Sequence, residues 1–108
     1  MSDPERWAKY EAMTLFEIIR NLESLDDNLT ICAARSPEWT EDSNAILTQS
    51  YIAAADCPIP YFLEVSVAKD VIRAWSHARS GRVPTSHECC EALIYYATND
   101  AYLLPAND

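Results

Sequence analysis

Apolar positions recur with a helical period near the start of the chain. Thr14 followed by Glu17 forms the pattern of a capping box, in which each side chain satisfies a backbone amide at the start of a helix. The apolar residues that follow are three and four positions apart: Leu15, Ile18, Ile19, Leu22 and Leu25. The pattern predicts a helix over residues 15–24, and residues 2–12 before it are compatible with one or two further helical turns.

Three stretches in the middle of the chain have the composition of strands. In residues 28–34, apolar and polar side chains alternate and β-branched residues are frequent, which predicts a strand. Residues 45–53 and 60–67 are predicted to form two more strands. Pro58 and Pro60 separate these two and exclude a helix between them.

The helical period returns in the last third of the chain. A helix is predicted from Ser66, a suitable N-cap, to a stop at Gly81, the only glycine of the sequence. Thr85 and Glu88 form a second capping-box pattern, which predicts a last helix over residues 86–99.

The order of these elements predicts a small α+β domain. A three-stranded antiparallel sheet would pack with about three helices in the order α-β-β-β-α-α. With 108 residues, of which 49% are hydrophobic, the chain is expected to be a single domain spanning 1–108 with one core. The side chains expected to form that core are Leu15, Ile18, Leu29, Phe62, Val71, Trp75, Leu93 and Ile94.

The charge of the chain is strongly acidic and unevenly distributed. The formal net charge is −9: residues 1–64 hold 12 acids and 4 bases, residues 65–83 one acid and 4 bases, and residues 84–108 four acids and no base. Such a surface repels nucleic acid and anionic lipid, and it accelerates encounters with basic partners. We therefore expect a protein partner with a basic surface, and no direct contact with nucleic acid or membrane. Solubility alone would also explain the acidity.

The sequence offers no sign of export, membrane insertion or a cofactor. No apolar run approaches the roughly 20 residues of a membrane span, and the first ten residues are too polar for a secretory signal. We therefore expect a cytoplasmic protein whose Cys32, Cys57, Cys89 and Cys90 are reduced thiols. Their spacing matches no zinc-binding pair, and no phosphate-binding or nucleophile motif is present, so no cofactor is expected.

The sequence HECCE, at the start of the last predicted helix, is the strongest candidate for chemistry. His87 and Glu91 share a helix face, and with His77 they could supply two histidines and a carboxylate to a metal ion. An ordinary helix start explains the sequence better, because Glu88 belongs to the capping box. Cys89 and His87 face apart on a helix and make no nucleophile pair. No catalytic residue and no metal ligand is assigned.

Aromatic residues are more numerous than the core requires. They are Trp39, in a polar loop over residues 35–44, and Tyr51, Tyr61, Phe62, Tyr95, Tyr96 and Tyr102. Exposed tyrosine and tryptophan near carboxylates are typical of protein-binding surfaces, although amphipathic tyrosines also line the edge of a core with their hydroxyls in water. Because adjacent helical residues point about 100° apart, Tyr95 and Tyr96 cannot both lie on one buried stripe. The candidate partner-binding residues are Glu38, Trp39, Glu41, Asp42, Tyr95, Tyr96 and Asp100.

Three stretches carry a resemblance to known sequences: PYFLEVSVAKDVIRAW, ALIYYATNDAYL and, before them, EWTEDSNAIL. They resemble a family of small acidic bacterial proteins of uncharacterised activity, over most of residues 14–104. The resemblance marks, without assigning roles, Trp39, Glu64, Lys69, Asp70, Tyr96, Asn99 and Asp100. In size and charge, though in no motif, the chain also resembles toxin-immunity proteins and phage-encoded inhibitors of the anti-CRISPR type.

These features lead to a functional hypothesis. We expect a non-enzymatic, acidic inhibitor that occludes a basic protein partner, as an immunity protein or antitoxin does. A phage anti-defence inhibitor, similar to an anti-CRISPR, is one alternative. A small metal-dependent enzyme that uses His77, His87 and Glu91 is the other. The sequence also leaves a homodimer open.

Overall fold

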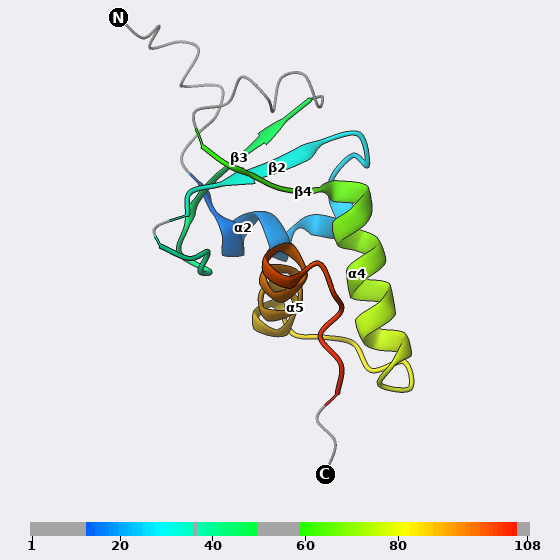
Figure 1. The fold of residues 1–108 in the computed structure, drawn as a ribbon. Helices are drawn as coiled ribbons and strands as arrows, with labels where there is room; N and C mark the ends of the chain where they lie inside the picture. The colour runs from blue at the N-terminus through cyan, green and yellow to red at the C-terminus, as the bar shows by residue number, and fades with distance from the viewer. Residues whose placement is uncertain (1–12, 36, 50–58, 106–108) are drawn as a thin grey trace, which may run out of the picture.

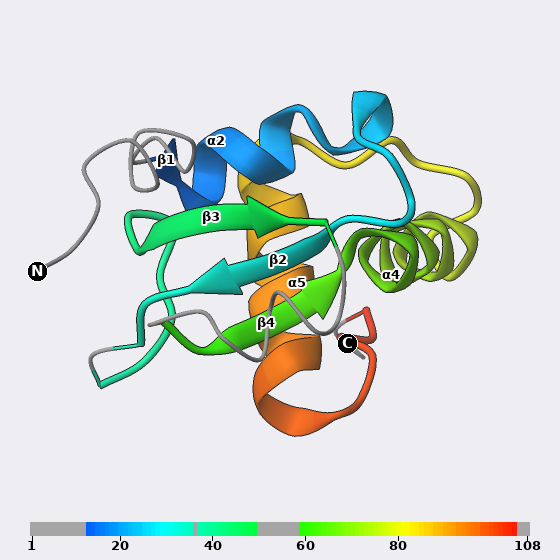
Figure 2. The ribbon, with the colours of Figure 1, turned by 90° about the horizontal axis from the view of Figure 1, so that it is seen from above.

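The computed structural model describes residues 13–35, 37–49 and 59–105, which form one antiparallel sheet with helices against one of its faces (Figure 1). The strands are β1 (Met13–Thr14), β2 (Thr30–Ala33), β3 (Asn44–Thr48) and β4 (Tyr61–Glu64). The helices are α2 (Leu15–Arg20), the short 3-10 helix η1 (Leu22–Ser24), α4 (Val65–His77) and α5 (Ser86–Asn99). The strand order is β1-β3-β2-β4, and α5 crosses beneath the sheet (Figure 2). The α+β class is therefore confirmed.

The sheet is organised around β2, whose four residues are all buried. Ile31 of β2 pairs with Leu47 of β3 and Leu63 of β4, and these three side chains contribute to the main core against the helices. The β4 register shifts between Ile31 and Cys32. Such an irregularity breaks the strict alternation of strand side chains. As a result, the consecutive residues Phe62 and Leu63 both lie in the main core.

Both capping boxes are confirmed. The hydroxyl of Thr14 accepts a hydrogen bond from the amide of Glu17 at 3.1 Å, and the Glu17 carboxylate accepts one from the Thr14 amide at 2.9 Å. Thr85 and Glu88 make the same reciprocal pair at 3.1 and 3.0 Å. These local bonds explain why α2 and α5 begin where they do.

The first turn of α2 is also tied to the loop between β2 and β3. The amide of Leu15 donates to the carbonyl of Ser43, and the amide of Phe16 donates to the carbonyl of Glu41, both at 2.9 Å. The first amides of a helix have no partner within the helix. Here the neighbouring loop supplies the acceptors, so that loop and helix are held together through their backbones.

The structure differs from the predicted elements in three places. The sheet has four strands instead of three, because Met13 and Thr14 pair with β3. The first helix ends at Arg20, and residues 22–24 of its predicted range form η1. The helix α4 begins at Val65, directly after β4 and without a side-chain cap, so the expected N-cap role of Ser66 was wrong. The strand predicted over residues 60–67 accordingly ends at Glu64. The additional strand, β1, depends on pairing with the distant strand β3, and a local sequence pattern does not reveal such pairing.

The predicted helix stop after α4 is confirmed. Gly81 and its neighbour Ser80 have φ angles of 85° and 60°, in the left-handed region that favours glycine. The amide of Gly81 donates to the carbonyl of Ser76 at 2.8 Å, which closes the end of the helix.

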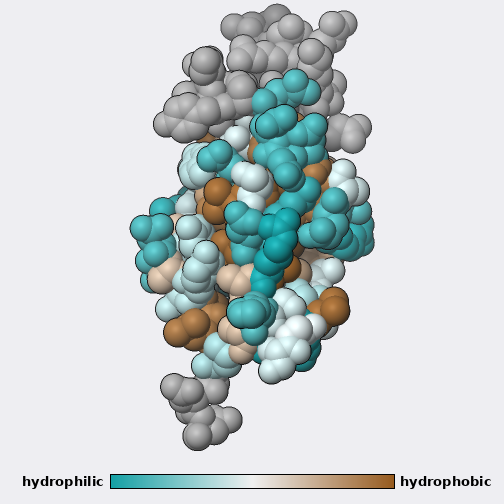
Figure 3. All heavy atoms as spheres, turned by 90° about the vertical axis from the view of Figure 1, so that its right-hand side faces the viewer, coloured by the Kyte–Doolittle hydropathy of each residue, from teal (hydrophilic) through white to brown (hydrophobic). Residues whose placement is uncertain are grey.

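The predicted core is confirmed. Six of the expected residues are buried: Leu15, Ile18, Phe62, Val71, Trp75 and Leu93. Leu29 and Ile94 are partly buried and pack against them. Hydrophilic side chains run along the side of the molecule on which α4 lies (Figure 3).

Some predictions concern residues that the structure does not describe. The additional turns over residues 2–12, the end of the strand predicted over residues 45–53, Tyr51 and Cys57 lie outside the described residues.

Replacing Trp75 should test the core directly. Its side chain is 4% exposed, so Trp75→Ala should lower the free energy of unfolding by about 3–5 kcal/mol, as other large core truncations do. Val83 is 83% exposed, and Val83→Ala is the matched control, expected within about 0.5 kcal/mol of the wild type. Urea unfolding followed by circular dichroism measures both. A Trp75→Ala variant as stable as the wild type would contradict this placement.

Candidate functional site

Two adjoining hollows lie between the β2–β3 loop, β4 and the C-terminal half of α5. The first has a volume of about 330 Å³, and its lining includes Glu38, Trp39, Glu91, Ile94, Tyr95 and Leu103. The second has a volume of about 280 Å³, and its lining includes Trp39, Tyr61, Phe62, Tyr96, Ala97 and Asp100. We call the residues around both hollows the Trp39 surface, because Trp39 lines each of them. Five of the seven predicted partner-binding residues lie there: Glu38, Trp39, Tyr95, Tyr96 and Asp100.

Trp39 forms the base of this surface and is not an exposed anchor. Its side chain is only 8% exposed, so the exposure expected for a residue in a polar loop was wrong. The indole N–H donates to the carbonyl of Ala33 at 2.9 Å. The ring packs edge-on against Phe62, with 5.0 Å between the centroids and 84° between the planes. The loop therefore folds back on the sheet and buries its one large apolar side chain, which lowers the exposed apolar area.

The two tyrosines of α5 point in different directions, as predicted. Tyr95 is 39% exposed and lines the first hollow. Tyr96 lines the second hollow and packs against the core and against Tyr102, whose ring centroid lies 5.5 Å away. Tyr95 is thus available to a partner, whereas Tyr96 mainly packs against the core beneath the Trp39 surface.

Three carboxylates surround these hollows. Glu38, Glu91 and Asp100 are exposed, and none of them has an ion pair within the residues that the structure describes. Asp100 caps the C-terminus of α5 with a left-handed φ of 53°. Glu91 was not among the predicted partner-binding residues. It lies four residues before Tyr95 on α5, and this spacing could have identified it, because residues four apart share a helix face.

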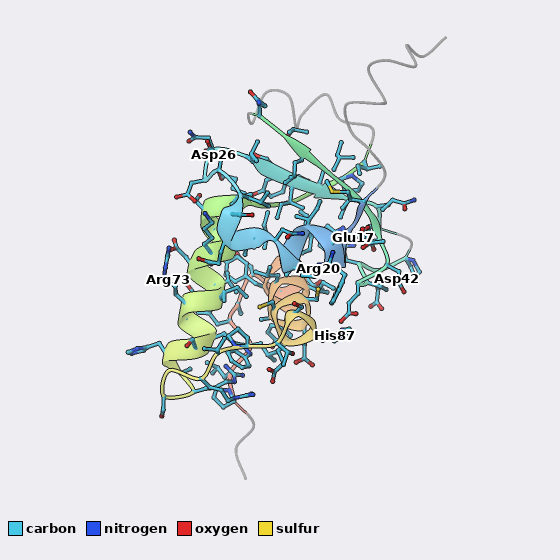
Figure 4. All side chains as sticks on the ribbon, turned by 180° about the vertical axis from the view of Figure 1, so that it is seen from behind. Glu17, Arg20, Asp26, Asp42, Arg73 and His87 are labelled. Atoms are coloured by element: carbon cyan, nitrogen blue, oxygen red, sulfur yellow. The ribbon has the colours of Figure 1, made fainter. Side chains whose placement is uncertain are left out.

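Glu41 and Asp42 do not belong to the Trp39 surface. The Nδ1 atom of His87 lies 2.8 Å from both carboxylate oxygens of Glu41, and the imidazole packs on Phe16 with 4.8 Å between the ring centroids. Seen from behind, Asp42 and His87 lie on the side of α2 away from α4 (Figure 4). The Glu41 carboxylate is therefore engaged within the molecule.

The HECCE sequence is the start of α5. Within the described ranges, no three histidine, cysteine, aspartate or glutamate side chains are arranged to hold a metal ion, so His77, His87 and Glu91 do not form a ligand set there. Burial raises the pKa of the Cys89 thiol, and it raises the pKa of Cys90 to about 12, with smaller contributions from Glu41 and Cys89. Both thiols are free and protonated at neutral pH, which makes them poor nucleophiles.

The lysine and arginine side chains that the structure describes are engaged in contacts within the chain. Lys69 binds Asp27 at 2.6 Å and the carbonyl of Leu25 at 2.8 Å, and Arg82 binds Glu88 at 2.8 Å. Arg73, which extends outward from α4 (Figure 4), pairs with Asp70 on the same helix.

Four of the described arginines lie over aromatic rings. Arg79 lies over the ring of Trp75, at 4.1 Å, and Arg82 lies over the same ring at 4.7 Å. Arg35 lies 4.5 Å from the centroid of Trp39. Arg20 lies over Phe16 at 6.0 Å. Across the part of the chain that the structure describes, each lysine and arginine thus contacts a carboxylate or an aromatic ring of the protein itself.

Comparison with family models, with curated proteins and with solved structures finds no match to this chain. A search of the described residues for a helix with the length and hydrophobicity of a membrane span also finds none.

Replacing Trp39 should reduce stability. Trp39→Ala removes a large buried ring and should lower the free energy of unfolding by about 3–5 kcal/mol. Trp39→Phe keeps an aromatic ring but loses the hydrogen bond to Ala33, which should cost about 1–3 kcal/mol. Tyr95→Ala, at an exposed position of the same surface, is the control and should change stability least. Equal stability of Trp39→Ala and the wild type in urea would contradict the burial of this ring.

The carboxylate of Glu88 should make stability depend on pH. The hydrogen bond from the Thr85 amide, followed by the contact with Arg82, lowers the pKa of Glu88 below its ordinary value of 4.5. A carboxyl whose pKa is lower in the folded state stabilises the fold above its unfolded pKa, and this stabilisation is lost as the pH falls through the folded pKa. Glu88→Gln should therefore lose less stability than the wild type on acidification below pH 4.5. Glu91→Gln is the control, and thermal melts across this range compare the two.

Proposed function

We propose that this protein is a non-enzymatic inhibitor that binds a basic protein partner through the Trp39 surface, in the manner of an immunity protein or antitoxin. One observation carries the proposal. Glu38, Glu91 and Asp100 surround two hollows and have no ion pair among the described residues. The described lysines and arginines pair with other carboxylates or lie over aromatic rings, and Arg35, which lies over Trp39, is not part of either lining.

Exposed carboxylates beside apolar hollows suit the recognition of a basic surface. Charges at the rim of an interface accelerate association with a partner of opposite charge. The apolar and aromatic lining supplies area that loses water on binding, and tyrosine and tryptophan contribute more than most residues to such contacts. Tyr95 offers an exposed ring between these charges. A partner bound here would have its basic surface covered, so that surface could no longer bind its own substrate or ligand.

The thiols and histidines support binding over catalysis. Cys90 has a pKa raised to about 12 and is buried. His87 is engaged with Glu41, and His77 is exposed at the end of α4. A cysteine nucleophile needs a lowered pKa, whereas the pKa of Cys89 and that of Cys90 are both raised.

A charge-reversal experiment tests the proposal. Affinity capture from the host at low salt, followed by mass spectrometry, should identify a basic partner whose association can be followed on a biosensor. Raising the salt from about 0.01 M to about 0.15 M shortens the screening length from about 30 Å to about 8 Å and should slow association. Glu38→Lys combined with Glu91→Lys should slow it in the same way, with a smaller effect on dissociation.

The matched control reverses two exposed acids away from the Trp39 surface, Glu23→Lys with Asp42→Lys. It changes the net charge by the same amount as the Glu38→Lys and Glu91→Lys pair. An equal effect of both pairs would show that only total charge matters, and it would contradict this location. A captured partner that is strongly acidic would overturn the proposal altogether. A toxin among the captured basic proteins would favour the immunity or antitoxin role, and a defence nuclease would favour the anti-defence alternative.

A further inference from the structure

The first hollow of the Trp39 surface has the size and lining of a site for one long side chain. Its volume of about 330 Å³ lies at the lower end of the range for small-molecule pockets. We propose that it receives an arginine side chain of the partner in preference to a lysine. This inference rests on the proposed function and adds to it the chemistry of the residue that is recognised.

The lining of this hollow matches both ends of an arginine side chain. Ile94, Leu103 and Trp39 are apolar and suit its methylene groups. Glu38 and Glu91 come from different elements, the β2–β3 loop and α5, and carry the two carboxylates that a guanidinium would contact. The charge of this lining is therefore complementary to a cation.

Tyr95 supplies the feature that distinguishes arginine from lysine. It follows Glu91 by four residues on α5, and its ring is 39% exposed at the hollow. A guanidinium is planar and weakly hydrated, so it stacks on an aromatic ring while it binds carboxylates at its edge. A lysine ammonium is a compact and strongly hydrated charge, and it gains less from the ring.

The cations of the chain itself follow the same chemistry. Arg79 and Arg82 lie over Trp75, and Arg35 lies over Trp39. Lys69, in contrast, contacts a carboxylate and a backbone carbonyl as a point charge. Arg35 is not among the residues that line the first hollow, so it does not occupy the proposed position.

Two short peptides test the inference on the full-length protein. The probes are the blocked tripeptides acetyl-Gly-Arg-Gly-amide and acetyl-Gly-Lys-Gly-amide, added to isotope-labelled protein at up to about 10 mM, where millimolar affinities are measurable. Nuclear magnetic resonance shifts of the Trp39 indole and of the amides of residues 91–99 report occupancy. The arginine peptide should bind about two to five times more tightly than the lysine peptide, as expected for a partly exposed cation–π contact.

Matched variants separate the contributions of the ring and the charge. Tyr95→Leu should abolish the preference for arginine, whereas Tyr95→Phe should retain it because the ring remains. Glu38→Gln with Glu91→Gln should weaken both peptides, and Glu23→Gln should weaken neither. Equal affinity for the two peptides, shifts confined to another surface, or no shift with the arginine peptide would overturn the inference. A basic partner whose association still depends on Glu38 and Glu91 would, in that case, leave the proposed function standing.

Discussion

The buried position of Trp39 determines how the β2–β3 loop lies against the sheet, and the two hollows of the Trp39 surface depend on it. Its indole N–H is bonded to Ala33 of β2, and its ring packs against Phe62 of β4, so the loop that carries it must lie against the sheet. This places Glu38 beside α5, close to Glu91 and Tyr95. A buried tryptophan in a polar loop thus converts a connection between strands into one wall of two hollows. The same ring contributes to the core and forms part of both hollows.

The cations and the anions of this protein serve different purposes. Its lysines and arginines, as far as the structure describes them, lie over rings or beside carboxylates, where they cover Trp75 and Trp39 and tie α4 to the segment after η1. Lys69 illustrates this, because it joins α4 to Asp27 and the carbonyl of Leu25. The surplus of carboxylates, which gives the net charge of −9, then sets the outer electrostatic field. Such a field favours solubility and rapid encounter with cations.

The parts of the fold that depend on neighbours in the sequence could be predicted from it. The capping boxes at Thr14 and Thr85 need only a residue three positions away, and both are present. The two-residue strand β1 and the register shift in β4 depend on pairing with distant segments, and the sequence pattern revealed neither.

The candidate site also combines features that follow from local sequence with features that depend on distant contacts. Tyr95, Tyr96 and Asp100 come from one helix, so their proximity followed from helical spacing. The approach of Glu38 to that helix, and the pairing of Glu41 with His87, depend on how the β2–β3 loop folds. The interpretation of Trp39 as exposed failed for the same reason, since a polar composition of its neighbours does not determine where the ring packs. Side chains on a loop take their environment from tertiary contacts.

The backbone bonds between α2 and the β2–β3 loop have a consequence for local unfolding. Leu15 and Phe16 donate to the carbonyls of Ser43 and Glu41, while Thr14 belongs to β1 and also caps α2. None of these pieces can separate without exposing the amides of another, so the sheet edge, the helix start and the loop form one cooperative unit. The amide hydrogens of Leu15 and Phe16 are therefore expected to be protected from exchange with solvent by similar factors, because one shared opening exposes both.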